Sequence, residues 1–224
     1  MSYDLVVFDC DGVLVDSEAL VVDVEAALLT EAGFELSPAD LIDRFVGLSY
    51  PTMMATIEAD FGRPVPEELG QRVQQAALDR IASDLEPIPG MAELLASLTM
   101  PRCVASSSDL DRITMSLAVC GLDRYFAVES IFSAQMVERP KPAPDLFTLA
   151  ARSSGVEPEV CIVVEDSPHG VTGAVAAGRT AVGLLAGGHV GPNLAGRLKD
   201  AGADAVFPTA AELAHYLGCS VATG

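Results

Sequence analysis

The chain alternates short apolar runs with polar turns, a pattern that is typical of an α/β protein. Leu5–Phe8 is an apolar run, and two carboxylates, Asp9 and Asp11, follow it in a turn that Gly12 opens. Short branched runs bounded by turn residues are typical of buried strands. Similar runs predict five further strands, at 102–105, 130–133, 160–164, 181–185 and 205–207.

Helix patterns separate these strands in the second half of the chain. They predict helices at 91–98, from Ser108 to Gly121, at 144–153, at 171–177 and after a capping box at 209–212. Strands that alternate with helices indicate βαβ units and a mostly parallel sheet. We therefore expect an α/β fold with a Rossmann-like core, in which helices cover both faces of the sheet.

No strand pattern interrupts residues 18–86. Apolar positions at helical spacing predict helices at 18–33, from Pro38 onward, at 53–61 and at 67–85. Consecutive helices between the first and second strands are expected to form a separate insert. We predict a catalytic core of residues 1–16 and 88–224 and an all-helical cap of residues 17–87.

Charge and cysteine usage exclude several classes of protein. The formal net charge is −19, which argues against nucleic-acid or anionic-membrane partners because both recruit basic surfaces. The five cysteines are widely spaced without a C-x-x-C pair, which favours a reducing compartment. Residues 1–4 carry no basic side chain, and the apolar run after them is too short for a secretory signal, so we expect no such signal here. No apolar run approaches the roughly 20 residues of a membrane span. We expect a soluble cytoplasmic protein, either a monomer or a weak homo-oligomer.

Polar residues follow the predicted strands where a shared ligand site is expected. Asp9 and Asp11 follow the first strand, Ser106 follows the second, Lys141 lies in a proline-rich loop, and Glu165–Asp166 end a later strand. The carboxyl ends of parallel strands meet at one edge of the sheet. Acids that can hold Mg²⁺, with a hydroxyl and a lysine for phosphate, suit phosphoryl transfer to a carboxylate nucleophile.

Each of these segments also has a purely structural explanation. Ser106 is one of three consecutive turn serines, Lys141 suits a solvated loop, and Glu165–Asp166 suits a helix cap. The combination of all four segments favours the site.

The four segments, taken in order, resemble those of the haloacid dehalogenase superfamily of aspartate-nucleophile phosphohydrolases. They are the Asp9-Cys10-Asp11 motif, Ser106, Lys141 and the Glu165-Asp166 pair, with a helical insert after the first. This arrangement is similar to the helical-cap branch, which includes β-phosphoglucomutase and many sugar-phosphate phosphatases. The resemblance covers essentially the whole chain.

The resemblance implies a role for each matched residue. Asp9 is the nucleophile and a Mg²⁺ ligand, and Asp11 is the general acid and base whose carbonyl also binds Mg²⁺. Ser106 and Lys141 bind the phosphoryl group, and Glu165 and Asp166 complete the metal site. The backbone N–H groups of Cys10, Asp11 and Ser107 line the phosphate pocket.

Departures from the family pattern narrow the expected reaction. The dehalogenases of the family lack the second aspartate of the first motif, so the presence of Asp11 favours phosphoryl transfer. The members that form a Schiff base use a lysine of the cap, and residues 18–86 contain no lysine. The mutase-like members carry a histidine and basic residues in the cap, where this chain has Val21-Val22 and 46–50. We expect Mg²⁺-dependent hydrolysis of a small phosphorylated metabolite, a sugar or polyol phosphate, through an aspartyl-phosphate. The alternatives are a phosphomutase and a non-catalytic metabolite-binding protein.

Residues outside the motifs are assigned lesser roles. His169, His189 and His215 share no ligand spacing and are interpreted as surface or packing residues. Glu18 stands at the entry to the insert, as part of the first helix or as a substrate contact. Arg44 is interpreted as a surface residue, with contact to a distal anionic or hydroxyl group of the substrate as the alternative.

Overall fold

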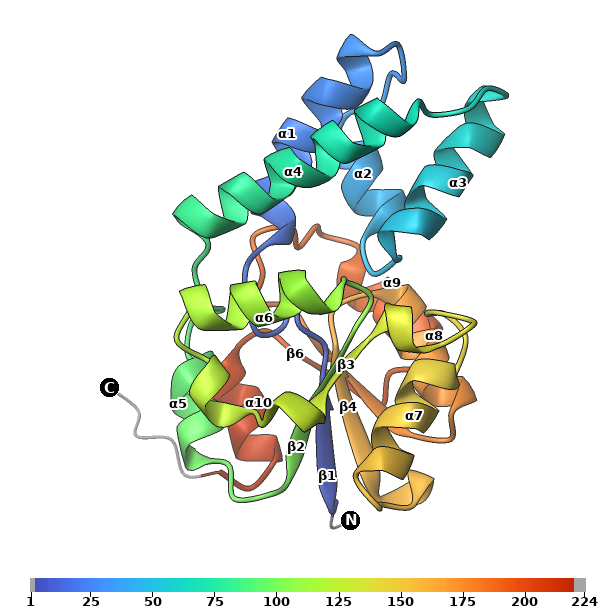
Figure 1. Ribbon diagram of the computed structural model, residues 1–224. Helices are drawn as coiled ribbons and strands as arrows, with labels where there is room; N and C mark the ends of the chain where they lie inside the picture. Colours follow the sequence, from blue (N-terminus) through green and yellow to red (C-terminus); the bar gives the residue numbers. More distant parts are fainter. Residues whose placement is uncertain (1–2, 220–224) are drawn as a thin grey trace.

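The computed structural model describes residues 3–219, which form a parallel sheet with an inserted helical region (Figure 1). The six parallel strands run in the order β3-β2-β1-β4-β5-β6. They are β1 (Leu5–Phe8), β2 (Arg102–Ser106), β3 (Ile131–Ser133), β4 (Cys161–Glu165), β5 (Thr180–Leu184) and β6 (Ala205–Phe207). In a doubly wound sheet of this order the direction of winding reverses between β1 and β4, and ligands bind at that reversal. The Rossmann-like α/β prediction is confirmed.

Alternate residues of β1 point into two separate apolar layers. Val6 and Phe8 face α5 (Met91–Ser97), α6 (Leu110–Val119) and α10 (Ala210–Tyr216). Leu5 and Val7 face α7 (Asp145–Ser153), α8 (Pro168–Ala176) and α9 (Leu194–Asp200). All four strand residues are at most 1% exposed, so β1 lies at the centre of a sheet covered on both faces. Short 3₁₀ turns occupy Asp123–Tyr125, Val128–Ser130, Ala134–Met136 and Pro158–Val160.

Four of the inserted helices stand beyond the carboxyl ends of the strands (Figure 1). They are α1 (Glu18–Glu31), α2 (Pro38–Phe45), α3 (Tyr50–Phe61) and α4 (Glu67–Asp84), and their apolar faces meet in a third cluster around Leu29, Phe34, Ile57 and Val73. The fifth inserted helix, α5, packs instead against α10 in the core. We call α1–α4 the cap helices. The boundaries at 17 and 87 stay a prediction, and residues 1–2 and 220–224 of the predicted core lie outside the described residues.

The two connections between the core and the cap helices run side by side. The N–H of Asp16 donates to the carbonyl of Glu86 at 2.9 Å, and the N–H of Ile88 donates to the carbonyl of Leu14 at 3.0 Å. The chain therefore leaves the core and returns to it at one place.

Several boundaries differ from the sequence predictions. The helix α8 begins at Pro168 rather than at 171, because the Ser167 hydroxyl accepts the Gly170 N–H and caps it. The helix α9 was not predicted, because Leu198 is its only fully buried residue and Gly196 weakens its pattern. Within the described residues, no helix combines the length and the apolar character needed to cross a membrane.

Candidate active site

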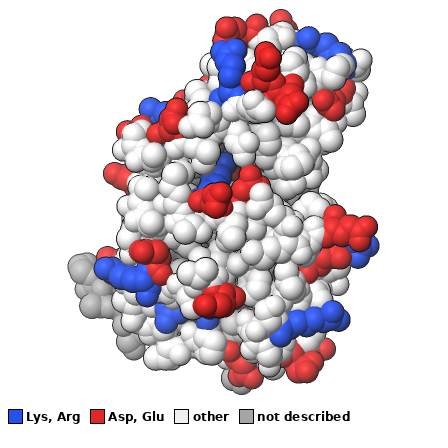
Figure 2. Space-filling model, viewed as in Figure 1, with Lys and Arg blue, Asp and Glu red and all other residues white. Residues whose placement is uncertain are grey.

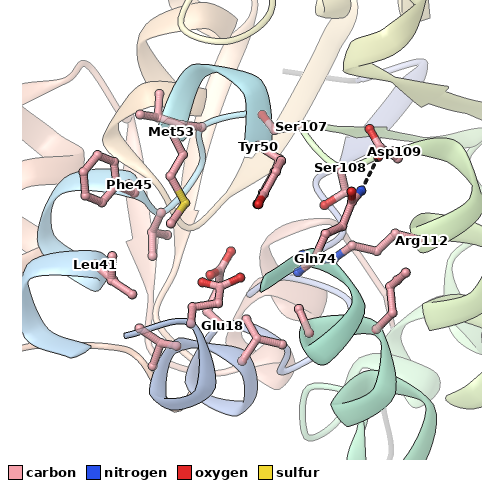
Figure 3. Close-up of a pocket in the computed structure, with 17 residues that line it drawn as sticks. Glu18, Leu41, Phe45, Tyr50, Met53, Gln74, Ser107, Ser108, Asp109 and Arg112 are labelled. Atoms are coloured by element: carbon pink, nitrogen blue, oxygen red, sulfur yellow. Dashed lines mark hydrogen bonds between the residues drawn. The ribbon is translucent and has the colours of Figure 1, made fainter. Parts of the chain in front are cut away.

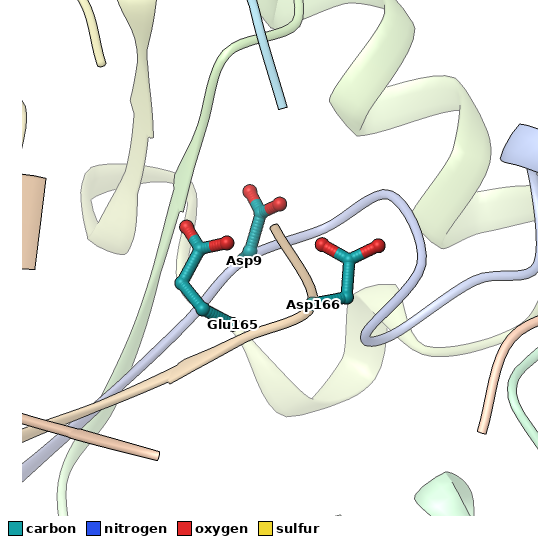
Figure 4. A group of neighbouring side chains, drawn as sticks. All are labelled: Asp9, Glu165 and Asp166. Carbon is teal, nitrogen blue, oxygen red and sulfur yellow. The ribbon is translucent and has the colours of Figure 1, made fainter. Parts of the chain in front are cut away.

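Three carboxylates from two neighbouring strands meet at the reversal point of the sheet (Figure 4). Asp9 follows β1, Glu165 is the last residue of β4, and Asp166 follows it. One oxygen from each lies within 4.8 Å of the others, and all three residues are buried. Like charges at this separation repel, so the arrangement needs a cation or shared protons.

Lys141 supplies part of that compensation. Its Nζ lies 2.9 Å from Asp9 Oδ1 and 2.6 Å from Glu165 Oε1, and its side chain is fully buried. Burial acts to lower the pKa of the lysine, but the two carboxylates raise it above its usual value, so the ammonium is charged. Burial raises the pKa of Asp9 well above its usual range, and Lys141 only partly opposes this shift. Lys141 therefore balances only part of a cluster that carries up to three negative charges.

The Asp166 carboxylate differs from that of Glu165, because neither of its oxygens accepts an aligned hydrogen bond. The Glu165 carboxylate accepts from Lys141 and from the Ser167 hydroxyl at 3.1 Å, so both its oxygens are engaged. Both Asp166 oxygens are buried without a hydrogen-bond partner. Buried unpartnered carboxylate oxygens are costly, and they are the ligands that Mg²⁺ prefers. The residues present therefore fit a divalent cation.

Asp11 lies in a different environment from Asp9. Its carboxylate accepts from the hydroxyls of Ser17 at 2.5 Å and Ser108 at 2.6 Å, and Arg112 Nη2 lies 2.9 Å from Asp11 Oδ1. Burial acts to raise the pKa of Asp11, but Arg112 and the hydroxyls outweigh it and hold the pKa below its usual value. The two aspartates of one motif therefore differ in protonation tendency: the surroundings of Asp9 favour its protonated form, and those of Asp11 favour its ionised form.

The remaining predicted site residues also lie around this cluster. Ser106 is fully buried at the end of β2, with its Oγ 3.4 Å from Asp11 Oδ2. The Ser107 hydroxyl donates to the carbonyl of Gly47 in the loop between α2 and α3, at 2.8 Å. The Cys10 side chain is buried in the core, which leaves only its backbone for ligand contact.

Two residues at the site were missed from the sequence. Arg112, on the first turn of α6, was not singled out, although it lies only six positions after Ser106. His189 was interpreted as a surface or packing residue without a place at the site, and the structure buries it there: its side chain is 1% exposed and its Nε2 lies 2.9 Å from Asp166 Oδ2. The ring is not aligned for a hydrogen bond, so the contact is one of charge and packing. The Gly187-Gly188 pair before His189 was a signal of a tight loop that approaches the site.

A pocket opens between the cap helices and this edge of the sheet (Figure 3). Its volume is about 780 Å³, counting the part that is open to solvent. Of the cap positions 21, 22 and 46–50, which were compared with those of the mutase-like members, 21, 22, 46, 48 and 50 line it. Arg44 does not line it and pairs with Asp60 on the surface, as predicted.

Known proteins are similar to this chain in both sequence and fold. The family model for haloacid dehalogenase-like hydrolases matches residues 6–184. A 6-phosphogluconate phosphatase from Escherichia coli (strain K12) is 32% identical over 176 residues, which are 78% of this chain and 79% of that protein. A fructose-1-phosphate phosphatase from the same strain is 29% identical over 182 residues, which are 80% of this chain and 95% of that protein.

A solved structure agrees over nearly the full length. It is the crystal structure of a conserved haloacid dehalogenase-like protein of unknown function from Agrobacterium tumefaciens str. C58, with 39% sequence identity and a TM-score of 0.84. The alignment covers 97% of this chain and 98% of that one, so it includes the inserted helices. The family match reaches from β1 through β5, and it contains every residue of the acidic cluster. The chain therefore belongs to the haloacid dehalogenase-like hydrolases, as a phosphatase of the branch with a helical cap.

Proposed function

We propose that this chain is a Mg²⁺-dependent phosphatase that hydrolyses a small sugar or polyol phosphate through an aspartyl-phosphate on Asp9. The observation that carries the proposal is the placement of Asp9. Its carboxylate lies at the sheet edge, beside the Lys141 ammonium and next to the unpartnered oxygens of Asp166. A nucleophile, an anion-binding cation and a candidate metal site therefore coincide at this edge of the sheet, and the pocket adjoins them through Ser108 and Arg112, which both contact Asp11.

The residues act in two steps. A carboxylate oxygen of Asp9 attacks phosphorus, the bond from phosphorus to the leaving oxygen breaks, and that oxygen takes a proton from Asp11. A water then attacks the phosphorus of the aspartyl-phosphate and gives its proton to Asp11, which restores Asp9 and releases phosphate. The ionised form of Asp11, which its present partners favour, is the form that the second step needs.

Lys141 and Ser106 hold the transferring group in this scheme. The Lys141 ammonium neutralises one phosphate charge while it stays paired with Asp9, so nucleophile and electrophile approach without full repulsion. Mg²⁺ would be held by Asp9, Asp166 and the Asp11 carbonyl, with Glu165 close by, and it would supply the remaining positive charge for the phosphate oxygens.

A phosphomutase is the second candidate, because it uses the same nucleophile and fold. It requires a cap that holds the second phosphate of a bisphosphate. Among the lining residues of the described pocket, Arg112 is the one basic side chain, and it is paired with Asp11. This observation favours hydrolysis.

The test is phosphate release from a panel of sugar and polyol monophosphates, with Mg²⁺ and with a chelator. The wild type should release phosphate with the metal only, and Asp9→Asn should release none while its folding, followed by circular dichroism, is retained. Isomer exchange without net phosphate release would instead identify a mutase. Binding of panel members without turnover of any would identify a binding protein.

A further inference from the structure

The charged residues of the pocket do not balance. Three carboxyl groups, from Glu18, Glu25 and Asp109, line it together with one guanidinium, from Arg112. Arg112 is already committed, because its Nη2 lies 2.9 Å from Asp11 Oδ1. Among the described lining residues, no basic group is therefore left to meet a second negative charge on a ligand.

Two of these carboxyl groups belong to one face of α1. Glu18 and Glu25 are seven positions apart, or two helical turns, so both point from α1 to the same side. Figure 3 shows the Glu18 carboxyl projecting into the space that Tyr50, Gln74 and Arg112 surround. The opposite part of the wall is apolar and includes Leu41, Phe45 and Met53.

Both groups resist ionisation, chiefly because they are buried. Burial raises the pKa of Glu18 to about 8 and that of Glu25 to about 7, and the nearby Asp11 raises both further. Arg112 opposes these shifts but does not cancel them. A protonated carboxyl group can donate to and accept from a hydroxyl, whereas an added anion finds no free cation among the described lining residues.

We infer that Glu18 and Glu25 are specificity residues, which restrict the pocket to leaving groups that carry hydroxyl or amino groups and no second negative charge. The inference rests on the proposed phosphatase function. The inferred substrate preference differs from the activity named for the 6-phosphogluconate phosphatase described above, because 6-phosphogluconate carries a carboxylate at the end remote from its phosphate.

The experiment uses two substrates that differ only at that end. Glucitol 6-phosphate has a CH₂OH group where 6-phosphogluconate has a carboxylate. For the wild type with Mg²⁺, we expect kcat/KM to be at least about tenfold higher for glucitol 6-phosphate, which corresponds to about 1.4 kcal/mol. Glucosamine 6-phosphate should be used at least as well as glucose 6-phosphate, since its ammonium group faces carboxyl groups.

Matched charge substitutions on one helix locate the effect. Glu25→Lys supplies the missing cation inside the pocket, and Asp23→Lys makes the same change on the exposed side of α1. Glu25→Lys should lower the preference for glucitol 6-phosphate over 6-phosphogluconate about tenfold or more, while Asp23→Lys should leave it unchanged. Glu25→Gln and Glu18→Gln, which keep the side-chain volume, should lower it at alkaline pH, where the wild-type carboxyl groups are ionised.

The outcomes separate the two hypotheses. Equal use of the two substrates by the wild type, or equal effects of Glu25→Lys and Asp23→Lys, would overturn the inference and leave the phosphatase standing. Failure of the wild type to release phosphate from any small monoester would instead overturn the proposed function. Thermal denaturation of each variant shows whether a lost activity is only lost folding.

Discussion

Replacing Lys141 by methionine should destabilise the fold severely, because it leaves two buried carboxylates without the cation that pairs with them. The lysine is fully buried, and its partners Asp9 and Glu165 are 5% and 0% exposed at their side chains. Methionine has a similar length and shape but no charge, so the packing volume is kept while the charge is removed. Breaking one side of a buried ion pair costs about 3–5 kcal/mol. That is a large part of the roughly 5–15 kcal/mol that stabilises a typical domain.

The chain offers a matched control, because it has only two lysines. Lys199 is exposed on α9, so Lys199→Met should change the stability by less than about 0.5 kcal/mol. For a chain of this size, a loss of 3–5 kcal/mol lowers the melting temperature by about 6–20 °C. The measurement is thermal and urea denaturation with a chelator present, since a bound cation would replace part of the missing charge.

A double variant tests the physical reason. Lys141→Met with Glu165→Gln removes the cation and one of the two stranded carboxylates, so it should recover part of the loss. If Lys141→Met melts within about 3 °C of Lys199→Met, the buried pair is not a main source of stability and the reasoning is wrong. If the double variant is no more stable than Lys141→Met, the loss comes from packing rather than from charge.

Three further predictions follow from the described contacts. A Cβ on Gly170 would lie 2.0 Å from the Glu165 carboxylate, so Gly170→Ala should lower the free energy of unfolding by about 1–3 kcal/mol. A Cβ on Gly196 would have nothing within 4 Å, so Gly196→Ala should leave the stability unchanged or raise it. Chemical denaturation of the two variants measures the difference. Burial raises the pKa of Glu25 to about 7, so the folded state binds this proton more tightly than the unfolded state, and the free energy of unfolding falls as the pH rises from about 4.5 to 7. Relative to Glu25→Gln, the wild type should lose about 1–2 kcal/mol of stability over that window. If the difference in stability between the two proteins is the same at pH 4.5 and pH 8, this prediction is wrong. Mg²⁺ at ten times its dissociation constant should stabilise the wild type by about 1.4 kcal/mol but should have little effect on Asp166→Asn, and calorimetry measures both.

The sequence predicted the parts of the site that strand ends determine. Asp9, Ser106 and Glu165–Asp166 each adjoin a strand, and the parallel sheet necessarily brings these positions to one edge. Lys141 was predicted from its motif, and the structure shows why a lysine is needed there, since its ammonium lies between two carboxylates.

Contacts between elements that are distant in sequence could not be predicted in the same way. Arg112 reaches Asp11 across 101 positions, and His189 reaches Asp166 from a loop that returns over the sheet. Neither contact follows from periodicity, because each depends on the angle at which a helix or loop leaves the sheet. The pocket charge balance depends on the same angles, and only the folded chain shows that Glu18 and Glu25 share a wall with Arg112.

The paired connections at the base of the cap have a consequence for how such enzymes diversify. The backbone leaves and rejoins the core at adjacent points, which the Asp16–Glu86 and Leu14–Ile88 hydrogen bonds join. The inserted helices are therefore attached at one place to a sheet that is continuous without them. The positions of the strands therefore do not depend on the length of the insert. The residues of the acidic cluster belong to the sheet, whereas most residues that line the pocket belong to the inserted helices. Substitutions in those helices can therefore change substrate choice while the sheet keeps the residues of the reaction.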